Sequence, residues 1–253
     1  MPATALTITT PEEGLVAGEV KVPAKGGDMP AYRAMPASGD GFPVILVVQE
    51  IFGVHEYIKD VCRRLAKLGY FAIAPELYAR QGDPSRISDI PTLVKDIVSK
   101  VSDEQVIADL DACVDYAKAS GKGDTARLGI TGFCWGGRTT LMYAGHNPRL
   151  RAAVAWYGPT NRPYHAGDAT ALDIAPRIKA AVLGLYGGAD TGIPSDTVLQ
   201  MRDALTAACV RNEFVIYPDT PHAFHADYRP GYRKDEAEDG WKRAIAWFAA
   251  NGV

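Results

Sequence analysis

The chain has 253 residues, of which 47% are hydrophobic and 23% are charged, a composition typical of globular proteins. This composition excludes a disordered, collagen-like or coiled-coil chain. The formal net charge is −3, so there is no net positive field to attract the phosphates of a nucleic acid, and we expect no nucleic-acid partner. Because α/β folds commonly take this length as one domain, we expect a single domain over residues 1–253.

The apolar runs, the first twenty residues and the cysteines bear on whether the protein is expected in a membrane, outside the cell or in the cytoplasm. The longest apolar run, residues 42–48, is far shorter than the roughly 18 to 20 residues that cross a bilayer, so no membrane partner is expected. Residues 1–20 contain no basic residue and no apolar core, unlike a secretory signal. Four scattered cysteines without a C-x-x-C pair indicate neither a zinc site nor a disulfide framework. Taken as complete, the chain is expected to be cytoplasmic, as a monomer or small homo-oligomer.

The first half of the chain alternates predicted strands and helices. Residues 14–36 are predicted to form an antiparallel edge hairpin around Gly26 and Gly27. A buried strand is expected over Val44–Gln49 and another over Tyr70–Ala74. Between them, Val54–Leu68 has apolar residues at helical spacing and ends at Gly69, as a helix packed on a sheet does. Residues 79–91 contain Gly and Pro and are expected to be irregular.

The second half continues the alternation. Buried strands are predicted over Arg127–Thr131, Ala152–Tyr157, Ala181–Tyr186 and Glu213–Tyr217, and helices over Ser102–Ala119, Gly136–His146, Pro194–Cys209 and Arg233–Ala250. Ser102 and Gln105 are spaced as a capping box, and residues 158–176 form a second long connection. Alternation of this kind predicts a three-layer α/β fold, with a mostly parallel sheet covered by helices on both faces.

One strand-to-helix junction carries a nucleophile pattern. The predicted strand before Gly132 leads into Gly132-x-Cys134-x-Gly136 and then into a helix. This is the nucleophile-elbow pattern with a cysteine in place of the serine. A helix N-terminus favours the thiolate, which is the form of cysteine that attacks a carbonyl carbon. Cys134 is therefore the predicted nucleophile, whereas Cys62, Cys113 and Cys209 fall in amphipathic helix patterns and are expected to be core residues.

A cysteine nucleophile on this fold needs a histidine base and an orienting acid, in the chain order nucleophile, acid, histidine. His222 follows a predicted strand, and Asp190 follows the strand before it, so both are expected at the carboxyl edge of the sheet. The alternatives are less well placed. They are His225 for the base, Asp196 and Asp219 for the acid, and the histidines His55, His146 and His165, which we interpret as surface or capping residues.

Two further groups are expected at the same edge. A buried strand ends in Glu50, whose carboxylate needs a partner or a role in the site if it is buried. The backbone N–H groups of Ile51 and Trp135 are the expected oxyanion donors. Arg80 follows another strand end and has the geometry to bind a substrate carboxylate with two hydrogen bonds.

Five motifs in this order resemble the dienelactone hydrolase family (carboxymethylenebutenolidase), a cysteine branch of the α/β-hydrolase fold. They are Gln49–Gly53, Pro75–Gln81, Gly132–Gly137, Gly187–Asp190 and His222–Phe224, and the similarity spans roughly residues 15–250. The resemblance implies a Cys134, Asp190 and His222 triad, with Arg80 receiving a substrate carboxylate. It also implies that Glu50 holds the resting thiol and releases it when substrate binds.

The resemblance favours hydrolysis of dienelactone (4-carboxymethylenebut-2-en-4-olide) to maleylacetate through a thioester, with no metal and no organic cofactor. One departure weakens this substrate assignment. Family members that cleave dienelactone have a second carboxylate-binding arginine shortly after the histidine, where this chain has His225 and Ala226. Arg229 and Arg233 lie farther along and are candidate substitutes.

Three alternatives remain open from the sequence. The same fold can carry a broad esterase or thioesterase activity, or a non-catalytic redox-sensing role with an oxidisable Cys134. The run Gly132–Thr139 also comes one residue short of a phosphate-binding loop, with Arg138 in the place of its lysine. His222, His225 and Asp227 together suggest a metal site, but no separate group of ligands completes it. We therefore interpret these side chains as polar surface.

Overall fold

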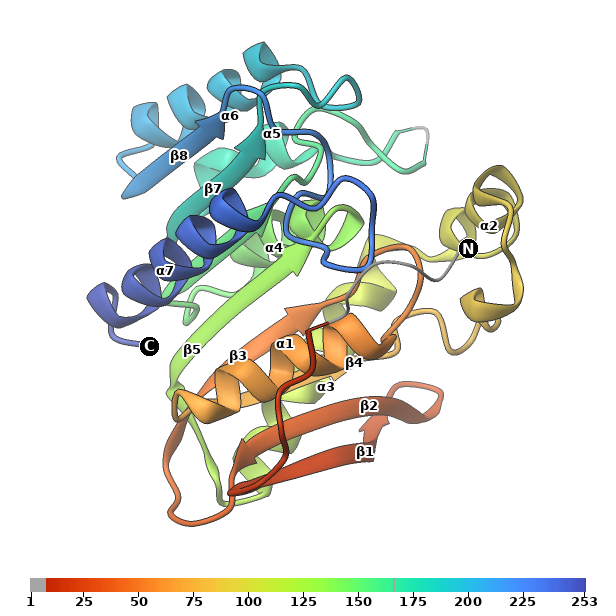
Figure 1. Ribbon diagram of the computed structural model, residues 1–253, viewed down its shortest axis with the longest axis vertical. Helices are drawn as coiled ribbons and strands as arrows, with labels where there is room; N and C mark the ends of the chain where they lie inside the picture. Colours follow the sequence, from red (N-terminus) through yellow and green to blue (C-terminus); the bar gives the residue numbers. More distant parts are fainter. Residues whose placement is uncertain (1–7, 166) are drawn as a thin grey trace. The chain divides into compact units, whose positions relative to one another are not determined.

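The computed structural model describes residues 8–165 and 167–253 (Figure 1). Within these ranges no helix combines the length and the apolar character needed to cross a bilayer. The contacts within the chain group into two compact units, residues 8–128 and residues 129–253. The expectation of one domain over 1–253 stays a prediction.

The first unit begins with the predicted hairpin. Its strands are β1 (Leu15–Ala24), β2 (Gly27–Pro36), β3 (Phe42–Val48) and β4 (Phe71–Pro75), and its helices are α1 (Glu56–Lys67), α2 (Ile90–Asp96) and α3 (Asp103–Ala119), with 3-10 turns at Pro84–Arg86 and Val98–Lys100. The strand order is β1-β2-β4-β3. β1 pairs antiparallel with β2, β2 antiparallel with β4, and β3 parallel with β4. The antiparallel edge hairpin is therefore confirmed.

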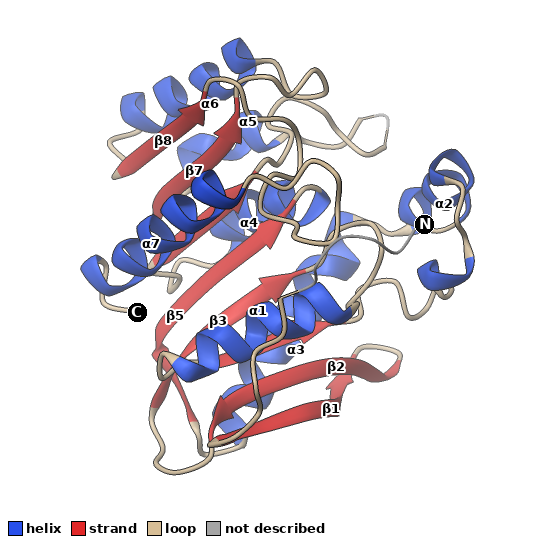
Figure 2. Cartoon of the chain, viewed as in Figure 1, coloured by secondary structure: helices blue, strands red, loops and turns tan. Residues whose placement is uncertain are grey.

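Helices cover the strands of this unit because their apolar residues fall on one side. In α1, Ile58, Val61 and Leu65 are buried and share the helical spacing that the sequence shows. α1 contacts β2 and β4, and α3 contacts β1, β3 and β4. Figure 2 shows α1 in front of these strands and α3 behind them.

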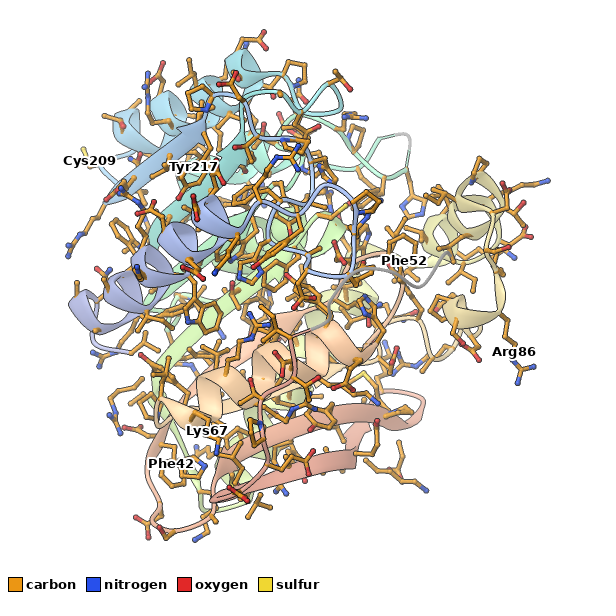
Figure 3. The ribbon with its side chains drawn as sticks, in the orientation of Figure 1. Phe42, Phe52, Lys67, Arg86, Cys209 and Tyr217 are labelled. Atoms are coloured by element: carbon orange, nitrogen blue, oxygen red, sulfur yellow. The ribbon has the colours of Figure 1, made fainter. Side chains whose placement is uncertain are left out.

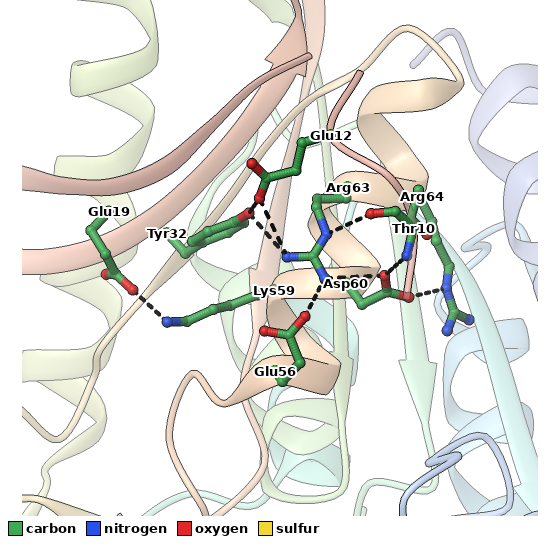
Figure 4. Close-up of polar contacts among 9 residues, drawn as sticks. All are labelled: Thr10, Glu12, Glu19, Tyr32, Glu56, Lys59, Asp60, Arg63 and Arg64. Atoms are coloured by element: carbon green, nitrogen blue, oxygen red, sulfur yellow. Dashed lines mark hydrogen bonds and ion pairs between the residues drawn. The ribbon is translucent and has the colours of Figure 1, made fainter. Parts of the chain in front are cut away.

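Hydrogen bonds and ion pairs link the segment that precedes β1 to α1 (Figure 4). The Thr10 backbone N–H donates to Asp60 Oδ1 at 2.5 Å, and Arg63 Nε donates to the Thr10 carbonyl at 3.1 Å. Arg64 Nε donates to Asp60 Oδ2 at 2.6 Å. Asp60 is fully buried, and these paired cations and N–H groups offset the cost of burying its charge.

The second unit is a parallel sheet with helices between its strands. β5 (Gly123–Phe133) begins in the first unit and ends in the second, which also contains α4 (Trp135–His146), β6 (Ala152–Trp156), α5 (Ala171–Ile174), the 3-10 turn Ala175–Arg177, β7 (Ala181–Gly187), α6 (Ser195–Ala207), β8 (Asn212–Tyr217) and α7 (Lys234–Ala250). The order is β5-β6-β7-β8, and all neighbours are parallel. Every residue of β6 and β7 is buried, and α4 and α7 both contact β6.

One short helix begins at the end of the segment expected to be irregular, residues 79–91, and another lies within the long connection expected over 158–176. α2 begins after Asp89, whose carboxylate accepts from the Thr92 backbone N–H at 2.9 Å, so Pro91 lies in a helix start. α5 has a complete capping box between Thr170 and Asp173. The expected box at α3 is half formed: Ser102 accepts from the Gln105 backbone, but the Gln105 side chain donates to Leu77 O instead.

The expectation that three cysteines lie in the core is wrong for one of them. Cys62 and Cys113 are fully buried, and desolvation raises the pKa of both thiols well above the usual range. Cys209 is exposed at the surface (Figure 3). The reason is that α6 ends at Ala207, so Cys209 lies in the following turn with a φ of 58°.

Candidate active site

The nucleophile candidate lies on a sharp turn between β5 and α4. Cys134 is the residue before the first turn of α4, with φ 55° and ψ −115°, a conformation that non-glycine residues rarely adopt. The Cys134 backbone N–H donates to the Trp156 carbonyl at 3.0 Å, and the Gly137 backbone N–H donates to the Cys134 carbonyl at 2.9 Å. These bonds hold Cys134 at the end of its strand, partly exposed.

The glycines of this motif are required by close backbone approach. A Cβ added at Gly132 would lie 2.2 Å from the Gly136 carbonyl oxygen, and one at Gly137 would lie 2.5 Å from the Trp156 carbonyl oxygen. Gly158, after β6, faces the same junction, since a Cβ there would lie 2.3 Å from the Arg138 nitrogen. The sequence pattern therefore follows from steric need at the elbow.

Gly187, the last residue of β7, lets the segments that carry the acid and the histidine approach each other. A Cβ at Gly187 would lie 2.2 Å from the Thr220 carbonyl oxygen, so only glycine lets the turn after β7 approach the loop after β8 this closely. The Ala189 backbone N–H donates to the same Thr220 oxygen at 3.0 Å. One residue beyond Ala189 is Asp190, and two residues beyond Thr220 is His222, so this contact sets their separation.

Asp190 and His222 form a short hydrogen bond. His222 Nδ1 lies 2.5 Å from Asp190 Oδ2, while Asp190 Oδ1 accepts the backbone N–H groups of Gly192 at 2.8 Å and Ile193 at 3.2 Å. Asp190 is 7% exposed. Its carboxylate is thus fixed at both oxygens, and it orients the imidazole ring.

His222 also hydrogen-bonds the side chain of Cys134. Because Asp190 occupies Nδ1, the other ring nitrogen is the one that faces the sulfur. Burial by itself lowers the pKa of His222, but the hydrogen bonds and charges of Asp190 and Cys134 outweigh burial and raise it to about 10. The arrangement therefore favours an imidazolium at His222, and a neighbouring imidazolium is one of the groups that activate a cysteine as a nucleophile.

Backbone strain concentrates around these side chains. Among the described residues, four non-glycine residues have a positive φ, and three of them adjoin the site: Cys134, Tyr157 and Ala223. The Tyr157 ring stands edge-on to the His222 ring with centroids 5.1 Å apart. Strained conformations of this kind persist where the surrounding structure fixes side chains for a function.

Cys134 and His222 open into a pocket of about 470 Å³ within the second unit. Its walls come from the end of β5, the connection after β6, the turn after β7 and the loop after β8; the lining residues are Cys134, Pro159, Arg162, Pro163, Tyr164, Asp190, Thr191, Gly192, Ile193 and His222. Arg162, Tyr164 and Tyr157 were not predicted from the sequence. Arg162 and Tyr164 lie in the long connection expected over 158–176, but nothing in its sequence singles them out.

The first unit holds the other three predicted site residues. Glu50 follows β3 and is fully buried, with Oε2 3.7 Å from His55 Nε2, so it is not a solvated strand-end residue. Ile51 lies in the turn that follows. Arg80 forms two hydrogen bonds with the buried Asp109, at 2.7 and 2.9 Å. These bonds already use the face of the guanidinium that would bind a carboxylate.

His225 and Asp227 are buried, which corrects the expectation of polar surface. The His225 ring stacks on Phe133, with centroids 5.4 Å apart, and lies 4.4 Å from the Trp156 ring. Arg138, proposed in place of a phosphate-loop lysine, is fully buried and donates to the Ala169 carbonyl at 2.9 Å.

Within the second unit, the alternative acids and the other histidines are not among the residues that line the pocket of Cys134 and His222. They are Asp196 in the first turn of α6, exposed Asp219, exposed His146, and His165 paired with Asp168. His55 is in the first unit, at the start of α1. In the part of the chain that the structure describes, no group of three His, Cys, Asp or Glu side chains is arranged to hold a metal ion.

A parallel sheet with a strained elbow residue, a histidine and an acid after successive later strands defines the α/β-hydrolase fold. The family model of the dienelactone hydrolase family matches residues 29–252. The chain belongs to this family, which confirms the resemblance and the fold class, and it is a hydrolase of that family.

Individual relatives agree with this assignment. The chain is 62% identical to a Methylorubrum extorquens protein named "Putative carboxymethylenebutenolidase", over 98% of this chain and 85% of the relative. A crystal structure named "Putative Dienelactone Hydrolase" from Klebsiella pneumoniae is 56% identical, with a TM-score of 0.90 over 93% of this chain and 98% of the other. A Bradyrhizobium protein named "Probable 2-oxo-3-(5-oxofuran-2-ylidene)propanoate lactonase" is 29% identical, over 90% and 92%.

Proposed function

We propose that this protein hydrolyses a lactone or an activated ester of a carboxylic acid, with Cys134 as nucleophile, His222 as base and Asp190 as the orienting acid. The observation that carries the proposal is the continuous hydrogen-bonded chain from Asp190 through His222 to Cys134, at the wall of a pocket. A nucleophile, a base and an orienting acid in this geometry are the machinery of acyl transfer.

The reaction begins when the Cys134 thiolate attacks the carbonyl carbon of the substrate. Negative charge develops on the carbonyl oxygen, for which the backbone N–H groups of Ile51 and Trp135 are the proposed donors. The carbon–oxygen bond to the leaving group breaks and a thioester forms, and the departing oxygen anion takes the proton of the His222 imidazolium, which leaves the ring neutral. His222 then removes a proton from water, the hydroxide attacks the thioester, and the carboxylic acid leaves as the thiolate is restored.

The chemistry of the nucleophile selects the substrate. A thiolate is itself a good leaving group. The tetrahedral adduct therefore gives the thioester only when the other group leaves more readily than sulfur, and otherwise it reverts to the substrate. An enolate, such as the one released from an enol lactone, leaves without prior protonation, whereas an amide nitrogen does not. We therefore expect lactonase and esterase activity and no peptidase activity.

Dienelactone is the substrate that we propose first, with maleylacetate as its product. The printed names of the relatives support an enol-type lactone, and the Bradyrhizobium relative is named for a lactone that bears a carboxylate. The alternative is a broader esterase or thioesterase that uses the same three residues. A phosphate-binding loop would need Arg138 in the place of its lysine, and the burial of Arg138 argues against that role.

Glu50 and Arg80 remain proposals of narrower scope. Glu50 is proposed as the carboxylate that holds the resting Cys134 thiol until substrate binds. Arg80 is proposed to receive a substrate carboxylate, which would then have to compete with Asp109 for the same guanidinium.

A substrate panel tests the proposed function. Wild type and Cys134→Ala are assayed with dienelactone, 4-nitrophenyl acetate and a peptide amide. We expect wild type to hydrolyse the first two and not the third, and Cys134→Ala to lose at least about 1,000-fold in kcat, the scale seen when a nucleophile is removed. Near wild-type rates in Cys134→Ala would refute the assignment of the nucleophile.

A further inference from the structure

We propose that Arg162, as the alternative to Arg80 in this role, binds the carboxylate of the substrate in the pocket of Cys134 and thereby sets the substrate preference of the pocket. Arg162 lines the pocket of Cys134 and His222 and comes from the connection between β6 and α5. This inference rests on the proposed hydrolase function, because it concerns the substrate of that same site.

The charge of Arg162 is not neutralised within the described residues. Its Nη2 donates to the Gly192 carbonyl, and among residues 8–165 and 167–253 no carboxylate forms an ion pair with it. The carboxylate that lines the same pocket, Asp190, is used by His222 and by two backbone N–H groups. The pocket therefore contains a cation with hydrogen-bond donors to spare, whereas Arg80 is bound to Asp109.

One turn positions both the triad and this arginine. The backbone N–H of Gly192 donates to Asp190 Oδ1, and the carbonyl of Gly192 accepts from Arg162. The position of the guanidinium is thereby linked to the carboxylate that orients His222. An anion bound by Arg162 would lie in the same pocket as the sulfur that attacks the carbonyl carbon.

The connection that carries Arg162 is fastened at several points. Thr160 Oγ1 donates to the Thr197 carbonyl at 3.0 Å. The guanidinium carbon of the buried Arg138 lies 4.5 Å from the centroid of the Tyr164 ring, and that ring lies 6.0 Å from the Trp135 ring. Because these contacts already hold the segment over residues 160–164, little conformational entropy is lost there when a substrate binds. The aromatic wall beside Arg162 also suits a planar, conjugated lactone.

Chemical complementarity points to a carboxylate. A guanidinium binds a carboxylate through charge-assisted hydrogen bonds, and a neutral ester cannot form them. Because Arg162 is exposed, solvent screening reduces its effect to about tenfold in affinity. The carboxylate is remote from the carbonyl that reacts, so the contact is equal in the bound substrate and in the transition state. The loss on substitution should therefore appear in KM rather than in kcat.

The test compares Arg162→Gln with Arg177→Gln, an exposed arginine outside this pocket, so that both variants lose the same charge. Each is assayed for ring opening of dienelactone and of its neutral methyl ester. We expect Arg162→Gln to raise KM for dienelactone about tenfold with kcat retained, and to leave kcat/KM for the methyl ester within about twofold. Arg177→Gln should match wild type on both substrates.

Equal losses on both substrates, or no loss on dienelactone, would overturn the inference. Arg162→Lys keeps the charge and should recover most of the affinity for dienelactone, and failure to recover any would also count against it. Hydrolysis of the methyl ester by Arg162→Gln shows that the variant is folded and that the triad works. If wild type instead hydrolyses neither substrate, the proposed function fails, and that outcome is distinct from a failure of Arg162.

Discussion

Cys134 shows how a backbone conformation and a side-chain role depend on one another. Its strained φ and ψ project the sulfur from the end of β5 to the side chain of His222. Cys62 and Cys113 lie in regular helix, are fully buried and have pKa values raised by desolvation, which keeps them as neutral thiols. The environment, and not the residue type, separates a reactive cysteine from core cysteines.

The raised pKa of His222 predicts an unusual pH dependence for alkylation of Cys134. A histidine pKa of about 10 means that the imidazolium persists as pH rises through the usual histidine range and is lost only near pH 10. A neighbouring imidazolium in general favours the thiolate form of a cysteine. We therefore expect the rate of alkylation of Cys134 by iodoacetamide to change less than about threefold between pH 6.5 and 9.

Peptide mass spectrometry measures this rate for each cysteine separately. The exposed Cys209 is the internal control, and its alkylation should rise steadily with pH, as it does for an ordinary thiol. In His222→Asn, the rate of alkylation of Cys134 should rise with pH as the rate at Cys209 does. A rate at Cys134 in wild type that tracks that of Cys209 would show that the two side chains do not form an ion pair.

The residues of the proposed triad could be singled out in the sequence because local motifs mark them. Each follows a predicted strand, and glycines mark the close approaches at Gly132 and Gly187. Arg162 and Tyr164 carry no such mark, since an arginine or a tyrosine in a long connection looks the same whether it lines a pocket or faces solvent. Their roles depend on the path of the whole connection, which short-range patterns do not determine.

At the scale of elements, the elbow works only if β5 and α4 meet without side chains between them. Gly132→Ala would place a Cβ 2.2 Å from the Gly136 carbonyl oxygen and 2.7 Å from Thr140 Oγ1, so backbone would have to move. We expect a loss of more than about 3 kcal/mol in the free energy of unfolding, together with loss of esterase activity. Urea denaturation and the 4-nitrophenyl acetate assay measure the two effects.

Gly14→Ala is the control for this substitution. Unlike Gly132, Gly14 has a positive φ, of 73°, but its added Cβ would meet nothing within 4 Å, so only a backbone cost of about 1 kcal/mol applies. Equal destabilisation by the two substitutions would show that close packing at the elbow is unimportant.

Arg80 joins the turn after β4 to α3 through Asp109, and this predicts a stability effect beside any effect on substrate binding. Removing the guanidinium leaves the Asp109 carboxylate, which is 1% exposed, without its cation. Arg80→Ala should lower the free energy of unfolding by about 3 kcal/mol, and Asp109→Asn in the same background should restore part of it. Denaturation curves of the single and double variants measure the coupling.

Kinetics on the same Arg80 variants test the carboxylate role. If Arg80 receives a substrate carboxylate, the folded Arg80→Ala enzyme loses activity on dienelactone and keeps it on the neutral methyl ester. Equal losses on the two substrates would contradict that role and leave Arg80 as a structural partner of Asp109.

The long helices could be predicted from the sequence and the short helices could not, for a physical reason. α1 and α3 repeat their apolar spacing over several turns, so their pattern is visible in the sequence. α2 and α5 have seven and four residues, too few to show a period, and only their capping residues Asp89 and Thr170 mark them. The proline that begins α2 was interpreted as a sign of irregular chain, although proline is common in the first turn of a helix.

At the scale of the whole molecule, the fold class followed from the alternation of strand and helix, because parallel neighbours require crossover connections. The substrate does not follow in the same way, since one α/β-hydrolase scaffold supports many esters. Family membership narrows the reaction to that of the dienelactone hydrolase family. The side chains that surround Cys134 in its pocket then determine which ester is bound.

The most direct test is to capture the covalent intermediate. Wild type is mixed with 4-nitrophenyl acetate, quenched in acid within the first turnovers, digested and analysed by mass spectrometry. The account predicts one acetyl group, attached as a thioester to the peptide that contains Cys134, and no such adduct in Cys134→Ala. An acetyl group on a different residue that turns over at the rate of hydrolysis, or hydrolysis that persists in Cys134→Ala, would contradict it.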